Sequence, residues 1–335
     1  MLTFALRRIF LLVPVLVGLS LLVFAIARML PGDPVQLAAG PQATREEIAA
    51  LTRELGLDKP LPVQYWNYAT GLLRGDWGQS ILSRRPVAQD LKAFLPATLE
   101  LVFAAMILAI GIGIPSGLMA AVYRDRWPDY VSRTFSLGAI SMPRFFLGLL
   151  LQLGFAMWLD WLPFGGRFPL TEAVPPLVTG FLTIDSIIAL DFDALAVALK
   201  YLVLPAFAMC LSPLATITRM MRASTIEVLQ QDYVLTERAL GLSSGIIVFK
   251  YVLKNAMSAT LTVIGLYFGW LLGGSVLVET VFDWPGIGLY ATKSIVTQDF
   301  MPIMGVTLAI GIIFVAANLV IDLLYGALNP KMRFE

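Results

Sequence analysis

Residues 221–255, MRASTIEVLQQDYVLTERALGLSSGIIVFKYVLKN, form a polar segment between two strongly apolar runs. Apolar residues recur in it at helical spacing, at Ile226, Leu229, Tyr233 and Leu240. This spacing predicts a helix over residues 225–240 that keeps its charges on other faces. A structured polar segment between apolar runs is expected to dock on a partner.

The same segment contains signals for a sharp break. Gly241 suits the left-handed position that ends a helix, and Leu242 would then fold back on that helix. Ser243 or Ser244 is placed to cap a second short helix. The segment therefore predicts two short helices joined at Gly241.

Composition places the chain among integral membrane proteins. It is 58% hydrophobic with a mean hydropathy of +0.79, and only 14% of its residues are charged, against about 25% in a soluble domain. The sequence has no histidine, which excludes histidine-based catalysis, metal ligation and proton relay. A net charge of +1 gives no reason to expect nucleic acid. The single cysteine, Cys210, cannot form an intrachain disulfide.

Six apolar runs are long enough to cross about 30 Å of hydrocarbon. They cover residues 9–27, 99–123, 134–158, 199–221, 259–282 and 302–324. The first follows Arg7 and Arg8 and resembles a signal peptide, but it exceeds the usual apolar length of one. We therefore expect an uncleaved first span in an all-α membrane protein with six transmembrane helices.

Residues 31–96 are polar and rich in turn signals, such as PGDP at 31–34. Thr44 and Glu47 have the spacing of a capping box that opens a short helix. We expect a small periplasmic lobe here, between the first and second spans. The predicted division is an N-terminal span at 1–30, the lobe at 31–96 and a transmembrane domain at 97–335.

The charge of the short segments predicts the orientation. Basic residues dominate 123–133, 219–255 and the tail at 331–333, whereas 160–198 is acidic. The positive-inside rule places the basic segments, and with them both termini, in the cytoplasm. Trp161, Phe164, Phe168 and Pro175-Pro176 would then lie outside, where they line an outer mouth or anchor at the membrane interface.

The chain shows no energy source of its own. The P-loop pattern is absent, and no catalytic constellation stands out, so we expect a transport subunit and not an enzyme. Glu100, Glu279 and Asp322 fall near the ends of runs, where snorkelling or an interface partner explains them. Pro115 and Pro143 are placed to bend the second and third spans. A stand-alone secondary carrier or channel stays open as an alternative.

Residues 232–256 carry a resemblance to a known family. Asp232-Tyr233, TERALGL at 236–242 and Asn255-Ala256 resemble the coupling loop of ABC importer permeases. Further motifs follow in order: LPGDP at 30–34, LGLD at 55–58, GDWGQS at 75–80, RPV at 85–87, LPATLE at 95–100, LPA at 204–206, ETVF at 279–282, WPG at 284–286, DLLY at 322–325 and NP at 329–330. Over nearly its whole length the chain is similar to the first, B-type, permease of the dipeptide/oligopeptide/nickel family.

The resemblance implies an assembly of several chains in a bacterial inner membrane. It implies a homologous second permease, two cytoplasmic ATPase subunits that hold the ATP and Mg²⁺, and a periplasmic solute-binding protein. No cofactor is expected in this chain. The coupling residues implied by the motif are Glu227, Asp232, Tyr233, Glu237, Ala239, Gly241 and Leu242.

The sequence departs from the family's coupling motif at two positions. Glu237 and Leu240 stand where the family pattern A-R-A-K-G has its first alanine and its lysine. Peptides, glutathione, nickel complexes, opines and oligosaccharides are all substrates within the family. Without histidine, direct nickel ligation by this chain is not expected, which leaves di- and oligopeptides or peptide-like solutes as the expected substrates.

Overall fold

The computed structural model describes residues 2–29, 35, 39–40, 42–54, 56–81 and 83–328, and these are almost entirely helical. The helices are α1 Leu2–Met29, α3 Arg45–Glu54, α4 Leu61–Leu73, α5 Val87–Val122, α6 Trp127–Ser141, α7 Arg144–Leu151, α8 Leu182–Ile188, α9 Phe192–Leu229, α10 Asp232–Ala239, α11 Ser244–Ile246, α12 Leu253–Val281, α13 Ile287–Val296 and α14 Phe300–Leu328. Two π-helical stretches, η1 Gln152–Trp158 and η2 Ile247–Val252, continue α7 and α11.

Within the described residues, five helices are long and apolar enough to cross a membrane. They cover Phe10–Met29, Val87–Val122, Phe192–Leu229, Ser244–Val281 and Phe300–Ile321. The remaining run is a pair of helices, Trp127–Ser141 and Arg144–Trp158, bent by 102°. Six spans result if this bent pair counts as one span, and the apolar run over 134–158 is then a span broken in its middle and not one continuous helix.

Of the two prolines expected to bend a span, only one stands at a break between helices. Pro143 stands at the break between α6 and α7, where it removes a backbone donor and forces extended backbone. Pro115, by contrast, lies inside α5, which continues past it to Val122. The expected bend in the third span is therefore confirmed, and α5 shows no break at the second.

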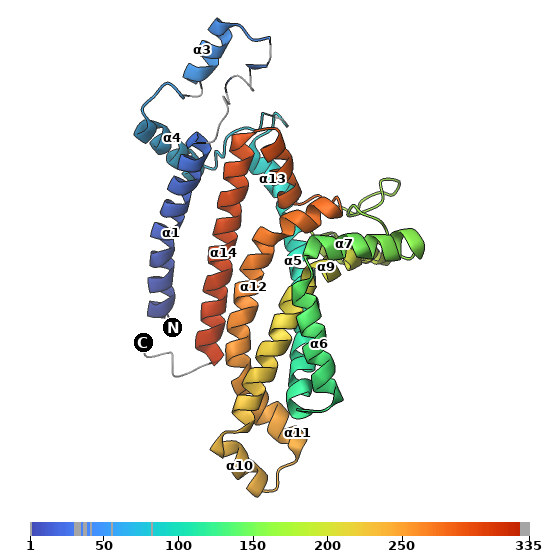
Figure 1. Ribbon diagram of the computed structural model, residues 1–335. Coiled ribbons are helices and arrows are strands. Elements are labelled where there is room, and N and C mark those ends of the chain that lie inside the picture. Colours follow the sequence, from blue (N-terminus) through green and yellow to red (C-terminus); the bar gives the residue numbers. More distant parts are fainter. Residues whose placement is uncertain are drawn as a thin grey trace.

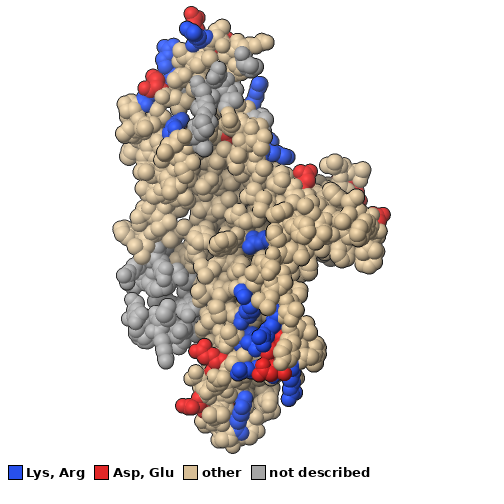
Figure 2. Space-filling view, in the orientation of Figure 1, with Lys and Arg blue, Asp and Glu red and all other residues tan. Residues whose placement is uncertain are grey.

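The long helices stand side by side between two ends of the molecule (Figure 1). One end carries α3, α4 and α13, and the other carries α10 and α11 together with the start of α6. Charged side chains gather toward both ends, and the band between them is nearly free of them (Figure 2). This distribution is the one expected of a protein that crosses a bilayer.

The core centres on α5, α9 and α12, whose buried faces are rich in small residues such as Ala105, Ala109 and Ala208. At the crossing of α5 and α9, a Cβ added to Gly117 would lie 2.5 Å from the Thr218 carbonyl oxygen. One added to Gly113 would lie 3.2 Å from the Leu214 carbonyl oxygen. The Gly113–Gly117 pair thus lets the two backbones approach closely, as small residues spaced by four do between membrane helices.

The helices in the described part of the lobe are α3, α4 and the first turns of α5, which begins at Val87. Thr44 and Glu47 form the expected capping box, in which the Thr44 N–H donates to Glu47 Oε2 at 2.8 Å and the Glu47 N–H donates to Thr44 Oγ1 at 3.3 Å. Tyr65 and Tyr68 of α4 pack against Phe24 of α1. The predicted turn at 31–34 and the tail motif at 329–330 lie outside the described residues.

Candidate functional site: the α10 tip

The α10 tip, residues 230–243, connects α9 to the helix that begins at Ser244. The chain leaves α9 at Leu229, turns through Gln230 and extended Gln231, and re-enters helix at Asp232. The single helix expected over 225–240 is therefore wrong. Its first part continues the long helix α9, and only the eight residues of α10 form a separate short helix.

One side chain fastens α10 to the body of the protein. Val234 is fully buried and packs with Ile247 and Val252 of η2, and with Leu242 beside them. Tyr233 adds a hydrogen bond, because its hydroxyl accepts from Asn255 Nδ2 at 2.8 Å. The apolar spacing seen in the sequence pointed to Tyr233 and Leu240 instead, and Leu240 is 72% exposed. The buried anchor is thus a residue that the periodicity argument missed.

Gly241 ends α10 as expected. Its φ of +78° lies in the left-handed region. The Leu242 N–H donates to the Glu237 carbonyl at 3.3 Å and the Gly241 N–H donates to the Arg238 carbonyl at 3.0 Å. These two bonds make a Schellman motif, which satisfies carbonyls that the helix end would otherwise leave open. The prediction for Gly241 and Leu242 is confirmed.

The second helix differs from the expectation. Ser243 occupies its N-cap position, but the hydroxyl of Ser243 makes no capping hydrogen bond. The helix is not short, since it runs without a break from Ser244 to Val281 and contains the π-helical stretch η2. The α10 tip is therefore joined directly to a membrane helix on each side.

The residues implied by the coupling motif lie mostly on the surface of this tip. Glu227, Asp232, Tyr233, Ala239 and Gly241 are exposed, and Glu237 and Leu242 are half-buried. Large apolar side chains on and beside the tip are also exposed: Leu235 at 55%, Leu240 at 72%, Ile246 at 47% and Phe249 at 69%. The tip thus presents apolar and acidic groups together, a combination suited to contact with a protein.

An ion pair connects the end of α9, just before the tip, to α6. Arg222, near the end of α9, donates to both carboxylate oxygens of Asp129 on α6, at 2.6 and 2.7 Å. Asp129 is fully buried. The orientation of the last turns of α9 is therefore tied to α6.

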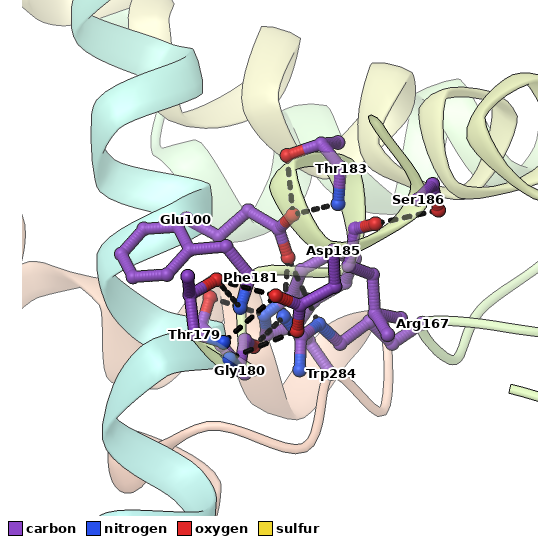
Figure 3. A network of polar contacts seen from close by, with 11 residues as sticks. Glu100, Arg167, Thr179, Gly180, Phe181, Thr183, Asp185, Ser186 and Trp284 are labelled. Atoms are coloured by element: carbon purple, nitrogen blue, oxygen red, sulfur yellow. Dashed lines mark hydrogen bonds and ion pairs between the residues drawn. The ribbon is translucent and has the colours of Figure 1, made fainter. Parts of the chain in front are cut away.

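A second polar network joins α5 to the loop before α8 (Figure 3). Glu100 of α5 pairs with Arg167 of the loop before α8, and it accepts from the N–H and the hydroxyl of Thr183 at 2.8 and 2.7 Å. Arg167 also donates to the Gly180 carbonyl and lies over the ring of Trp284. Glu100 is only 4% exposed, so it has partners and does not snorkel.

Glu279 of α12 is buried in the same way. It accepts from the Thr98 hydroxyl at 2.7 Å and from the Leu289 N–H at 2.9 Å, and so joins α12 to α5 and α13. The side chain of Asp322, the third acidic residue noted near a span end, lies outside the described residues.

The loop that contains Arg167 also encloses a hollow of about 1060 Å³, which is open to the surface. Phe164 and Phe168 line it together with Tyr201, as expected for aromatic residues at a mouth. Trp161 is 67% exposed and does not line the hollow. Among the described residues, no cluster of three or more cysteine, aspartate or glutamate side chains is placed to hold a metal ion.

Comparison with known proteins identifies the family. The family model described as "Binding-protein-dependent transport system inner membrane component" matches residues 113–334, and the model of its N-terminal part matches residues 1–102. The chain is 41% identical to the dipeptide transport system permease protein DppB of Alkalihalophilus pseudofirmus, with each chain covered in full.

Two further relatives agree. The probable D,D-dipeptide transport system permease protein DdpB of Escherichia coli is 41% identical, with 96% of this chain and 94% of the relative covered. The glutathione transport system permease protein GsiC of Salmonella choleraesuis is 39% identical, again over the whole of both chains. With its membrane helices and these matches, the chain belongs to the family of inner membrane components of binding-protein-dependent transport systems.

Proposed function

We propose that this chain is the permease subunit of an ATP-driven importer that carries di- and oligopeptides or peptide-like solutes. The substrate class rests on the relatives, which are named for dipeptides, D,D-dipeptides and glutathione. The common element of these solutes is a small, polar, carboxylate-bearing peptide backbone. The chain supplies part of the pathway and receives its energy from other subunits.

The assembly that we propose contains a homologous second permease, two cytoplasmic ATPase subunits and a periplasmic solute-binding protein. ATP and Mg²⁺ bind to the ATPase subunits. The α10 end lies in the cytoplasm of a bacterial cell with both termini on that side, and the lobe at 31–96 faces the periplasm and the binding protein. The basic residues of 123–133 and 219–255 support this orientation.

The observation that carries the proposal is the construction of the α10 tip. Val234 holds α10 rigidly on η2, while Leu235 and Leu240 remain exposed beside Asp232. A helix lying on a membrane surface would put its exposed apolar residues into lipid and would not favour acidic groups near anionic headgroups. A groove on an ATPase subunit accepts both kinds of residue. In the proposal, closure of the ATPase pair moves this tip and thereby changes which side of the membrane is open.

Co-purification tests the assembly. The tagged chain, expressed with the other genes of its transport system and isolated in detergent, is expected to retain stoichiometric ATPase subunits. In proteoliposomes it is expected to take up dipeptide only with ATP and binding protein. Transport by the chain alone, driven by an ion gradient, would instead support a secondary carrier.

Charge placed on the tip tests the docking surface. Leu240→Glu is expected to release the ATPase subunits during purification while the fold is retained, because a carboxylate replaces an apolar contact. The matched control is Leu170→Glu, which alters a fully exposed leucine of the outer loop. If the Leu240 variant keeps its ATPase subunits and its uptake rate, the docking surface is placed wrongly.

A further inference from the structure

Arg144 stands at an unusual place in the spans. It is the first residue of α7, directly after Pro143, at the point where the third apolar run turns by 102°. Runs of apolar residues precede and follow it in the sequence. A charged side chain within an apolar span is costly, and such residues mark ligand or ion pathways more often than structural contacts.

Among the described residues, the guanidinium of Arg144 has no charge partner. Arg167 and Arg222, the arginines that brace the two ends of the spans, each pair with a buried carboxylate. Arg144, by contrast, forms no hydrogen bond or ion pair with any residue that the structure describes, and it is half-buried. The cost of holding this charge in an apolar region is therefore not offset by any residue that the structure describes.

The Arg144 guanidinium lies against α12. Its neighbour on α12 is Gly274, where an added Cβ would lie 2.7 Å from Arg144 Nη1. Tyr267, also on α12, lies nearby, and its hydroxyl is hydrogen-bonded to the Thr216 hydroxyl of α9 at 2.8 Å. The carboxylate of Glu279 is engaged with Thr98 and Leu289 and does not neutralise Arg144.

The backbone at the bend adds hydrogen-bond donors, which carry partial positive charge like the guanidinium. The first-turn N–H groups of α7, at Arg144, Phe145 and Phe146, have no acceptor among the described residues, since the first helical bond is from the Leu147 N–H to the Pro143 carbonyl. Orphan N–H groups at a helix start favour an anion, and an unsatisfied N–H in hydrocarbon is costly. The guanidinium and the helix start therefore both favour an anionic ligand.

We propose that Arg144 and the first turn of α7 bind the terminal carboxylate of a peptide-like solute as it passes through the pathway. The inference rests on the proposed function, because it takes a peptide as the solute. A guanidinium pairs with a carboxylate through two parallel hydrogen bonds. Every unmodified peptide carries such a group whatever its side chains, so one arginine serves a whole class of substrates.

A carboxylate of the second permease is the competing partner for Arg144. An interchain ion pair would also neutralise the guanidinium, but it would serve assembly and would not distinguish one solute from another. The two cases differ in what a charge-removing variant changes. Loss of a solute contact lowers the uptake of carboxylate-bearing peptides alone, whereas loss of an interchain contact weakens the complex.

The experiment compares uptake of a dipeptide and of the same dipeptide with an amidated C-terminus. The full complex with its binding protein is reconstituted in proteoliposomes as wild type, Arg144→Gln and Arg144→Lys, with Arg133→Gln as a control at an exposed arginine of α6. The preference of the binding protein is common to all samples and cancels in the ratio of wild type to variant.

We expect Arg144→Gln to lower uptake of the free acid by about tenfold, the effect of one charge-assisted hydrogen bond, and to leave uptake of the amide unchanged. Arg144→Lys should fall between wild type and Arg144→Gln, and Arg133→Gln should match wild type. Equal effects on acid and amide, no effect on either, or loss of the second permease during purification would each overturn the proposal. Failure of the wild-type complex to import either dipeptide would instead refute the proposed function.

A second pair of variants keeps the charge of Arg144, and one of the two changes where the guanidinium lies. A side chain at Gly274 would displace the guanidinium, because even its Cβ would lie 2.7 Å from Arg144 Nη1, whereas a Cβ added at Gly273 meets no atom within 4 Å. We expect Gly274→Leu to reduce the preference for the free acid and Gly273→Leu to preserve it. The same preference in both variants would count against a site that depends on where the Arg144 guanidinium lies.

Discussion

Arg222 of α9 and Asp129 of α6 form a two-point ion pair, with Nε–Oδ1 at 2.6 Å and Nη2–Oδ2 at 2.7 Å. The carboxylate is fully buried, whereas the arginine side chain is 21% exposed. Asp129 lies in the first turn of α6 and Arg222 near the end of α9, so the pair connects two helices that are separate in the sequence. It fixes the last turns of α9 before the chain enters α10.

Removing this arginine should destabilise the protein. Arg222→Gln leaves Asp129 buried without its charge partner and is expected to cost about 2 kcal/mol in the free energy of unfolding. The matched control is Arg219→Gln, because Arg219 is exposed on the same helix and makes no ion pair among the described residues. The thermal midpoint in detergent measures both variants. Equal midpoints would show that the pair does not brace α9.

The helix crossing at Gly117 should be sensitive to a single methyl group. Gly117→Ala places a Cβ 2.5 Å from the Thr218 carbonyl oxygen, so α5 and α9 must move apart, at a cost of about 1–3 kcal/mol. Gly111→Ala, on the same helix, meets no atom within 4 Å and should be neutral or stabilising. Thermal midpoints that do not separate these two variants would contradict the close packing of α5 on α9.

Gly241 and Gly245 offer a matched test of the end of α10. Neither glycine has an atom within 4 Å of an added Cβ, but only Gly241 has a positive φ. Gly241→Val is therefore expected to deform the Schellman motif at a cost above about 1–2 kcal/mol, and to abolish substrate-stimulated ATPase activity in the assembled complex without preventing membrane insertion. Gly245→Val should retain that activity. If the Gly241 variant kept its substrate-stimulated ATPase activity, the turn at Gly241 would not be required for coupling to the ATPase subunits.

Asp185 of α8 should make the outer loop sensitive to acid. Burial raises the pKa of the Asp185 carboxyl, but hydrogen bonds from the Thr179 N–H and hydroxyl and from the Gly180 N–H outweigh this, and the pKa lies below its usual 3.8. A carboxyl with a lowered folded-state pKa adds stability above its unfolded pKa and loses it as the pH falls through the folded value. The stabilising effect is thus complete at neutral pH.

The comparison with Asp185→Asn tests this dependence. The difference in thermal midpoint between wild type and variant is expected to be constant from about pH 5 upward and to shrink below about pH 4. A difference that stays constant through this range would mean that ionised Asp185 does not hold the loop.

Local signals and membrane patterning were predictable from the sequence. The apolar runs located the spans, the Thr44–Glu47 pair located a helix start, and Gly241 located a helix end. Each depends on residues within one or two helical turns, or on a composition that hydrocarbon imposes. Family membership confirms the interpretation as a permease, a transport subunit and not an enzyme.

Long-range pairing was not predictable from the sequence alone. Glu100 meets Arg167 and Thr183 across 67 and 83 positions, and nothing local to any of them signals the contact. Val234 is buried because η2 lies beside α10. The end of α9 at Leu229, well before Leu240, is likewise not marked by the apolar spacing. Arg144, by contrast, is visible in the sequence as a charged residue directly after a proline inside an apolar run. Such a residue is a candidate functional site.

The position of α10 between two unbroken helices has a mechanical consequence. The helix on each side, Phe192–Leu229 and Ser244–Val281, is 38 residues long, or about 57 Å at 1.5 Å per residue. A tilt of about 10° at the tip would therefore carry the far end of the helix Ser244–Val281 about 10 Å sideways. Because α10 is joined to both helices, a force on the tip would act on both of them. A small movement of the tip would then become a larger displacement toward the opposite face of the membrane.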